Sequence, residues 1–413
     1  MTKNRKFITI LVLGMMTAIG PFSIDMYLPA FADIAADLHT TVGHLSLSLS
    51  SFFIGISIGQ FIYGPLLDRF GRKKPLYVGL VIYLIASALC AFVENADMLI
   101  ALRFLQALGG CAGMVASRAM VRDIFSVADN AKVFSMLMLV VAVSPIIAPT
   151  LGGFVTVELG WHYIFVILSL MALVMILAIH FGLPESKQPD SDYSLKPAAI
   201  FKNFGLVLRE PQFFTYAFTG AIGAAGLYAY IAGSPTVFLE LFKVTEKQYG
   251  FIFALVAGGL ILATQINNLL LRNYKSEQII PVALLLQCLA GICLFVGALS
   301  GWTGLTSTIV LLLVYLSCQG FIFPNSSALS MAPFSKHAGS ASALMGGVQM
   351  GLGALSSSLV SLFSNGTALP MASIMAICAI SSFIFLIIGN RIIRYKASTL
   401  LVAEESVDMI SNS

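Results

Sequence analysis

Charge is scarce in this chain of 413 residues. Only 10% of the residues are charged, against about 25% in a soluble domain, while 58% are hydrophobic. A helix needs about 20 mostly apolar residues to cross a membrane, so the hydrophobic residues suffice for about twelve crossings. The composition excludes a soluble enzyme with a single membrane anchor. The continuous apolar runs also exclude an outer-membrane barrel, in whose strands apolar and polar residues alternate.

The sequence also lacks the usual signals for nucleotide, metal or nucleic-acid chemistry. It contains no Gly-Lys dipeptide and therefore no Walker A loop, so ATP bound to this chain cannot drive transport. Its six cysteines lie in apolar runs without a C-x-x-C pair, and its five histidines show no metal-ligand spacing. A net charge of +4 on so few charges is no nucleic-acid signature. We expect no metal, no cofactor, no catalytic residue and no nucleic-acid partner.

The apolar residues form twelve runs, divided into two sets of six by a polar linker. This pattern predicts an N-terminal six-helix bundle over 1–183, a cytoplasmic linker over 184–211, a C-terminal six-helix bundle over 212–393 and a cytoplasmic tail over 394–413. The twelve runs lie near 7–31, 43–66, 75–93, 97–120, 131–157, 161–183, 212–238, 248–271, 277–299, 304–330, 339–364 and 369–390.

Lys and Arg indicate how the chain is oriented. If the N-terminus is cytoplasmic, twenty of the 23 basic residues fall in inner segments, two in outer segments and one, Arg103, inside a span. Positive charges favour the cytoplasmic side, so both termini are predicted to lie there, in a bacterial inner membrane. We expect an all-α membrane protein of two six-helix bundles, related by an axis along the membrane normal, with the site between them.

Two charged residues inside spans are the leading site candidates. Asp25 lies six residues before Phe31, and Arg103 lies six residues after Asp97, so each sits about 9 Å from the outer end of its span. Charges at such depths are rare and usually functional. Their equal depth permits a contact between the two side chains. Desolvation favours the protonated form of Asp25, whereas a nearby guanidinium favours the ionised form. Asp25 is the predicted proton carrier, and the alternative is a static ion pair between spans one and four.

The other candidates for substrate binding are small, aromatic or polar groups within spans. Phe22, Gly110 and Met114 share helix faces with the two charges, although ordinary helix packing explains them nearly as well. The second half offers amides, which are either substrate contacts or interhelical hydrogen bonds. The candidates among these amides are Gln265, Gln319, Asn325 and Gln349.

Two further segments have distinctive spacing. The turn from Gly64 to Lys74 reads Gly-x-x-x-Asp-Arg-x-Gly-Arg, with glycines that permit a tight reversal and close helix approach. Arg72 could reach an acid in the next inner loop, and Asp123 fits. Span five carries two prolines and two glycines, which would bend the helix and let it approach a neighbour. These residues are Pro145, Pro149, Gly152 and Gly153.

These motifs together resemble the major facilitator superfamily. Gly64, Asp68, Arg69, Gly71 and Arg72 match its signature loop, which implies a gating role for them. Arg103-Phe104-Leu105-Gln106 resembles its span-four motif, and 148–153 resembles the antiporter motif of its drug/proton exchangers, with Ala107 and Ala148 in place of the usual glycines. The segments 23–30, 122–123 and 161–165 are similar to those of the Bcr/CflA multidrug group. The resemblance implies that Asp25 and Arg103 serve proton coupling and drug binding.

The sequence therefore predicts a transporter and not an enzyme. The expected activity is proton-coupled efflux of small amphipathic drugs, such as bicyclomycin, sulfonamides or chloramphenicol relatives, by a monomer in membrane lipid. A metabolite permease, for a nucleoside or sugar, is the alternative. A membrane acyltransferase would need a His/Asp or Ser/His grouping in one layer, and none is found; the two-bundle repeat argues against a passive channel.

Overall fold

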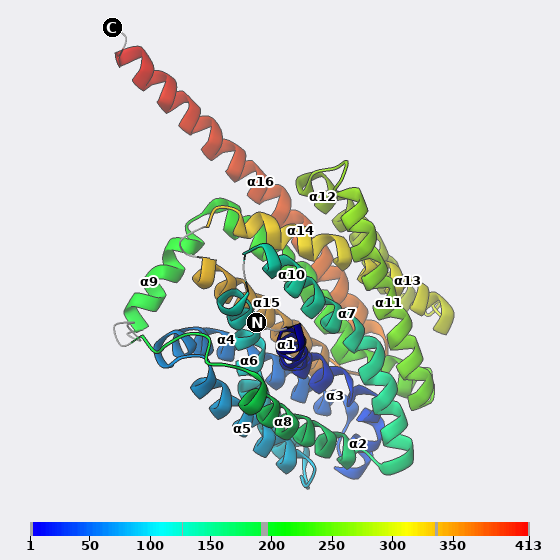
Figure 1. Cartoon of the computed structure of the whole chain (residues 1–413). Helices are drawn as coiled ribbons and strands as arrows, with labels where there is room; N and C mark the ends of the chain where they lie inside the picture. The colour runs from blue at the N-terminus through cyan, green and yellow to red at the C-terminus, as the bar shows by residue number, and fades with distance from the viewer. Residues whose placement is uncertain (1–2, 126, 191–196, 335–337, 412–413) are drawn as a thin grey trace.

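The computed structural model describes residues 3–125, 127–190, 197–334 and 338–411. Over these residues the chain is helical, and twelve helices are long and apolar enough to cross a membrane. Each coincides with one of the twelve predicted apolar runs, which confirms the predicted fold class (Figure 1).

The first half contains α1 (Lys3–Asp25), η1 (Leu28–Ala30), α2 (Phe31–Asp37), α3 (Val42–Leu45), α4 (Leu47–Phe70), α5 (Lys73–Cys90), α6 (Ala96–Ile124), α7 (Val127–Leu159) and α8 (His162–Gly182). The second half contains α10 (Pro211–Pro235), η2 (Thr236–Leu241), α11 (Glu246–Leu270), α12 (Ser276–Ser300), α13 (Leu305–Ser317), α14 (Gln319–Met331), α15 (Ala338–Leu362) and α16 (Leu369–Ser411). Between them lies α9 (Pro197–Leu208), which we call the linker helix.

The two halves meet along two matching pairs of helices. In the first half, α6 packs against α4 and α5, and in the second, α10 packs against α14, α15 and α16. Between the halves, α4 packs on α15 and α7 packs on α11. These are the second span on the eleventh and the fifth on the eighth, so each pair becomes the other when the halves are exchanged. This is the pairing that a parallel repeat produces.

Four spans are not continuous helices, which the apolar runs did not predict. The second span is divided at Ser46 into α3 and α4. The first span ends its α-helix at Asp25 and resumes as η1 and α2, with Pro29 in the first turn of η1. The seventh span ends in a π-helix, η2, directly after Pro235, and the tenth is divided at Cys318 into α13 and α14. Proline removes a backbone donor, but average hydropathy is unaffected by such breaks.

The molecule has two ends that differ in composition. We call the end that carries Lys6, the 64–74 turn and the linker helix the basic end, and the end that carries residues 38–41, 91–95 and 242–245 the opposite end. At the opposite end the halves touch: the Ser46 hydroxyl donates to the Ala232 carbonyl at 3.1 Å. Nearer the basic end, the Ser57 hydroxyl donates to the Gly347 carbonyl at 2.8 Å.

The linker helix was not predicted, because its segment was read as a polar stretch. It packs against α10 and α15, where Val207 is fully buried with Phe213 and Ala341. Residues 191–196 of the predicted linker lie outside the described residues. At the C-terminus, α16 runs on as one helix to Ser411, past the predicted start of the tail (Figure 1).

Candidate functional site

Asp25 is the last residue of α1 and lies where the two halves meet. Its exposure is 5%, and among the described residues no ion pair involves it. It interacts electrostatically with three tyrosines of the second half: Tyr228 and Tyr230 on α10 and Tyr249 on α11. Tyrosine hydroxyl groups of the other half therefore lie near this carboxyl group, and no ion pair with a cation involves it among the described residues.

The three tyrosines place hydroxyl groups in an otherwise apolar setting. The Tyr249 hydroxyl and that of Ser234 are 2.7 Å apart, and Tyr228 is hydrogen-bonded to Gln349. The buried Tyr230 hydroxyl has no hydrogen-bond partner within the described part of the chain. A buried hydroxyl without a partner is costly, so this group is available to a ligand or to water.

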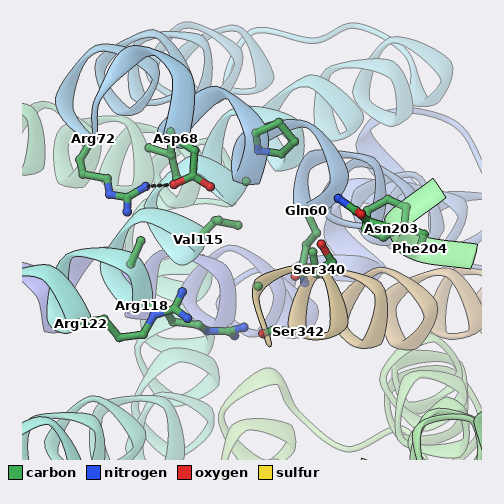
Figure 2. A pocket seen from close by; sticks show the side chains of 16 residues that line it. Gln60, Asp68, Arg72, Val115, Arg118, Arg122, Asn203, Phe204, Ser340 and Ser342 are labelled. Carbon is green, nitrogen blue, oxygen red and sulfur yellow. Dashed lines mark hydrogen bonds and ion pairs between the residues drawn. The ribbon is translucent and has the colours of Figure 1, made fainter. Parts of the chain in front are cut away.

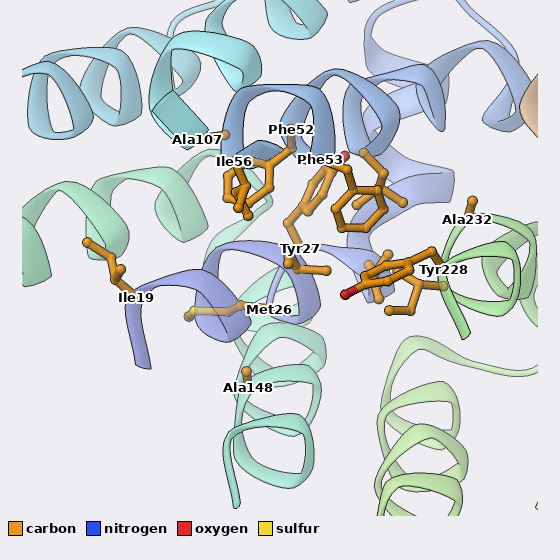
Figure 3. Packing of buried hydrophobic residues seen from close by; sticks show 14 of the residues in the cluster. Ile19, Met26, Tyr27, Phe52, Phe53, Ile56, Ala107, Ala148, Tyr228 and Ala232 are labelled. Atoms are coloured by element: carbon orange, nitrogen blue, oxygen red, sulfur yellow. The ribbon is translucent and has the colours of Figure 1, made fainter. Parts of the chain in front are cut away.

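Aromatic rings surround this region (Figure 3). The Tyr228 ring packs edge-on against Phe53 of α4, with ring centroids 4.7 Å apart, and Met26 and Tyr27 follow Asp25 directly in the chain. The Tyr228 hydroxyl points toward the Met26–Tyr27 segment in Figure 3. These tyrosines were not predicted, because a tyrosine is ordinary inside an apolar run and the candidates in the second half were amides.

Arg103 does not meet Asp25, in contrast to the expected contact. Its side chain is fully buried within the first bundle and donates to the Ser23 carbonyl at 2.8 Å and to the Gln106 side chain. The guanidinium carbon lies 4.5 Å from the Tyr27 ring centroid and 4.2 Å from that of Phe52. The expected pairing rested on depth alone, and depth does not fix the direction in which a side chain leaves its helix.

The reason for this arrangement lies in the break of the first span. An α-helix leaves its last four carbonyl groups without helical partners. Because α1 ends at Asp25, the Ser23 carbonyl is one of these, and Arg103 supplies the missing donor. A cation at this position also opposes the negative end of the helix dipole. Arg103 thus stabilises the end of α1, two residues before Asp25.

A ring of hydrogen bonds holds Arg103 in turn. The Gln106 amide donates to the Ser87 hydroxyl at 2.7 Å, and Ser87 donates to the Tyr83 carbonyl at 2.7 Å. The Tyr83 hydroxyl and the Ser23 hydroxyl form a hydrogen bond of 2.6 Å, which closes the ring. The ring joins α1, α5 and α6, so it fixes the position of the Asp25 backbone relative to the first bundle.

The small and apolar candidates of the first half contribute to packing between α1, α5 and α6. A Cβ on Gly110 would lie 2.9 Å from the Tyr83 ring, and one on Gly20 would lie 2.9 Å from the Met114 sulfur. Phe22 packs at the edge of the main core. The structure therefore does not bring Gly110 and Met114 to the Asp25–tyrosine region.

The amide candidates of the second half have different environments. Asn325 donates to the Asn267 side chain at 2.7 Å, an interhelical bond between α14 and α11. Gln319 is buried, and neither atom of its amide group has a partner among the described residues. Gln349 bonds Tyr228 and so belongs to the Asp25–tyrosine region. Gln265 is exposed.

The 64–74 turn forms a charged cluster at the basic end. Arg72 donates from Nε to Asp123 at 2.7 Å and from Nη1 to Asp68 at 3.0 Å, so the expected contact with Asp123 is present. Burial lowers the pKa of the Arg72 guanidinium, but the bonds to Asp123 and Asp68 outweigh it and leave that pKa raised. Lys187 also binds Asp68, at 2.8 Å.

The two glycines of this turn differ in what they allow. Gly71 has a φ of +81°, which residues with a side chain rarely adopt, and this permits the tight reversal. Gly64 has nothing within 4 Å of a built Cβ, so the close helix approach expected of it is not found here. Arg69 reaches away from the cluster and donates to the Asp190 carbonyl at 3.2 Å.

The α7 segment with Pro145 and Pro149 makes the close approach expected of its glycines. A Cβ on Gly152 would lie against the Met26 backbone, 2.7 Å from its carbonyl carbon, and a Cβ on Gly153 would lie 2.8 Å from the Glu246 carbonyl oxygen. The α7 backbone therefore packs on both the break in the first span and the start of α11.

A cavity of about 280 Å³ opens at the basic end between the two halves (Figure 2). Its wall comes from α4, α6, the linker helix and α15. Gln60 is the lining residue of α4 nearest to Phe53, seven residues away, so the cavity stops about 10 Å short of the Asp25 level. The two regions are therefore separate in this conformation.

Comparison with known proteins identifies the class to which this architecture belongs. The family model described as Major Facilitator Superfamily matches residues 13–358. The chain belongs to this superfamily of membrane transporters.

Individual similar proteins indicate a group within this superfamily. A Haemophilus influenzae protein named as a bicyclomycin resistance protein homolog is 31% identical, over 91% of this chain and 94% of its own length. The uncharacterized MFS-type transporter YdgK of Bacillus subtilis is 32% identical over 89% and 92%, and the multidrug resistance protein MdtL of Escherichia coli is 28% identical over 89% and 91%. The chain is thus similar to the Bcr/CflA-like drug transporters, as its motifs predicted.

A solved structure confirms the fold. A bacterial homologue of the human lysosomal transporter Spinster, in an inward-facing and unoccupied conformation, superposes with a TM-score of 0.71, covering 94% of this chain and 96% of the other at 16% identity.

Proposed function

We propose that this protein exports small amphipathic drugs across the bacterial inner membrane in exchange for protons, as a monomer with its basic end and both termini in the cytoplasm. The observation that carries the proposal is the setting of Asp25. A carboxyl group without an ion-pair partner lies at the junction of the two halves, opposite the tyrosines of α10 and α11.

The physical basis is the cost of an unpaired charge in a low-dielectric site. An enclosed Asp25 is favoured in its neutral, protonated form, and a conformation that admits water favours loss of the proton. Movement of the halves changes this surrounding, because the tyrosines belong to the second half. Protonation and conformation are thereby coupled, with no part taken by a bound nucleotide.

The other motifs receive supporting roles in the proposal. The cluster of Arg72, Asp68 and Asp123 holds the basic end of the first bundle together and gates it, and Arg103 positions α1 so that Asp25 keeps its place. The contacts of Gly153 with Glu246 and of Ser46 with Ala232 seal the opposite end between the halves. A cavity at the basic end and contacts at the opposite end correspond to a conformation open to the cytoplasm.

The drug class rests on the relatives, which are named for resistance to bicyclomycin or to several drugs. A permease for a nucleoside or sugar would share the fold and could share the coupling. Aromatic rings of Phe53 and Tyr228 on either side of the interface favour an amphipathic ligand with an aromatic or apolar part.

The test is proton-driven transport by the purified chain in liposomes. With a pH gradient imposed, the wild type should concentrate bicyclomycin, a sulfonamide or chloramphenicol, and Asp25→Asn should lose this accumulation because its side chain cannot exchange a proton. Asp33→Asn is the matched control, since Asp33 is exposed and only eight residues further along.

The outcomes separate the parts of the proposal. If Asp25→Asn still accumulates drug against its gradient, Asp25 is not the proton carrier. If the wild type moves none of the drugs but accumulates a nucleoside or sugar under the same gradient, the protein is the metabolite permease.

A further inference from the structure

The cavity at the basic end carries an excess of positive charge. Three arginines line it, Arg72, Arg118 and Arg122, together with a single acid, Asp68. Asp68 is already bound by Arg72 and Lys187, and Arg72 also binds Asp123. The charges of this cluster therefore neutralise each other and leave Arg118 and Arg122 as the cations that face the cavity.

Neither of these two arginines has a partner in the part of the chain that the structure describes. No hydrogen bond or ion pair involves Arg118 or Arg122 there, and Arg118 lies near a like charge, Arg122, one helical turn further along α6. Like charges four residues apart on a helix repel each other. Arg118 is also half-buried, so water screens its charge only in part.

Neutral polar groups complete the wall of the cavity. Both guanidinium groups extend from α6 toward α15, where Ser340 and Ser342 lie, while Gln60 and Asn203 lie on neighbouring walls (Figure 2). Hydroxyl and amide groups can donate hydrogen bonds to an anion beside the two guanidinium groups.

We infer that this cavity is a binding site for the anionic group of a small organic acid, such as an aromatic carboxylate, held by Arg118 and Arg122. The guanidinium groups bind the carboxylate oxygens, and Val115 and Phe204 contact the apolar part. The site lies apart from Asp25 and is the first that a solute meets from the basic end. The inference rests on the proposed function in one respect only: the basic end faces the cytoplasm, so the ligand is a cytoplasmic solute.

The test compares three probes that share a ring and differ in charge. The anionic 4-aminobenzoate, the neutral 4-aminobenzamide and the cationic 4-aminobenzamidine are bound at neutral pH to the full chain in phosphatidylcholine nanodiscs. Radiolabelled 4-aminobenzoate is displaced by each unlabelled probe. Because no gradient is present, the result does not depend on proton coupling or on Asp25.

The wild type should bind 4-aminobenzoate about tenfold more tightly than 4-aminobenzamide, with 4-aminobenzamidine weakest, because charge-assisted hydrogen bonds are the stronger ones. Arg118→Gln should remove most of this preference, Arg122→Gln should reduce it, and Arg118→Lys should keep part of it. Arg272→Gln is the matched control, since it removes an exposed cation at the basic end that does not line the cavity. The preference should also shrink with added salt.

Three results would overturn the inference. The first is equal binding of the acid and the amide by the wild type, and the second is an unchanged preference in both Arg118→Gln and Arg122→Gln. The third is loss of 4-aminobenzoate binding when phosphatidylglycerol is added to the nanodiscs, which would assign the two arginines to a lipid headgroup. If Arg118→Gln fails to fold, Arg118→Lys and Arg122→Gln still test the inference.

Discussion

Arg103 brings a full charge into the interior of the first bundle, where it replaces hydrogen bonds that the interrupted first span has lost. Its bonds to the Ser23 carbonyl and to Gln106 compensate for the cost of burying the guanidinium, and the rings of Tyr27 and Phe52 add cation–π attraction. The residue is thus a positioning residue for Asp25, because it holds the carbonyl two residues before it.

Removing this side chain should weaken both the fold and transport. Arg103→Ala leaves two buried acceptors, on Ser23 and Gln106, without their donor, at about 1–3 kcal/mol each. Arg103→Lys should lose less, since an ammonium group can satisfy one acceptor but lacks the planar fork that reaches both. The midpoint of thermal unfolding in detergent and the drug resistance of expressing cells measure the two effects. The control is the exposed Arg272→Ala. If Arg103→Ala is as stable and as active as this control, the ring of hydrogen bonds contributes neither to stability nor to transport.

At the residue level, the sequence located the two buried charges better than it predicted their contacts. Buried charge is rare in a membrane span, so Asp25 and Arg103 were visible from composition alone. Their partners were not, because equal depth is compatible with any direction around the helix axis. Tyr230 escaped notice for a related reason: a tyrosine is ordinary in an apolar run, and only the fold places its hydroxyl opposite Asp25.

Among the elements, α7 makes the tightest contact with the break in the first span. Backbone lies against Gly152, so an added methyl group cannot be accommodated by turning a side chain, and α7 must move away from Met26. Overpacking of this kind costs about 1–3 kcal/mol. We expect this contact to set the position of α7, from which Gly153 meets the start of α11 in the other half at the opposite end.

Gly152→Ala should therefore lower the midpoint of thermal unfolding and slow drug efflux. Each 1.4 kcal/mol of destabilisation lowers the population of the form that is closed at the opposite end by up to about tenfold. Gly258→Ala on α11 is the matched control: nothing lies within 4 Å of its Cβ, and alanine favours a helix over glycine by up to about 1 kcal/mol. Equal efflux and equal midpoints for the two variants would show that α7 relaxes without cost and does not seal that end.

The twelve spans were predicted in number and place, because about twenty apolar residues specify a span whatever surrounds it. The linker helix was missed, although Pro197 and the spacing of Phe204, Val207 and Leu208 carry a helical signal. The breaks at Asp25 and Cys318 were missed as well. At the break near Asp25, the backbone partner Arg103 comes from another helix and leaves no trace in a hydropathy profile.

At the scale of the whole molecule, the structure has a cavity at the basic end and contacts between the halves at the opposite end, as expected for one of the two conformations of the proposed alternating access. The second span packs on the eleventh and the fifth on the eighth, so the two bundles can rock about these paired contacts. Transport then requires the opposite end to open, and with it the contacts of Ser46 with Ala232 and of Gly153 with Glu246 must separate.

A disulfide across the opposite end should trap this conformation. A Cβ built on Gly43 of α3 lies 2.5 Å from the Ser364 Cβ, beyond the end of α15 in the other half. A disulfide needs about 3.8 Å between these atoms, so a backbone shift of about 1 Å suffices to form it. The pair Gly43→Cys and Ser364→Cys is introduced after the native cysteines, of which Cys293 is the exposed one, have been replaced by serine or alanine.

Oxidation of this double variant should abolish proton-driven drug accumulation in liposomes, and reduction should restore it, because the two halves can no longer separate at that end. Each single-cysteine variant should transport equally under both conditions. The same oxidised protein should still bind 4-aminobenzoate, since the cavity at the basic end stays open in the trapped form. Undiminished accumulation by a fully cross-linked protein would mean that solutes cross without opening the opposite end, and the rocking of two six-helix bundles would then not be the transport mechanism of this chain.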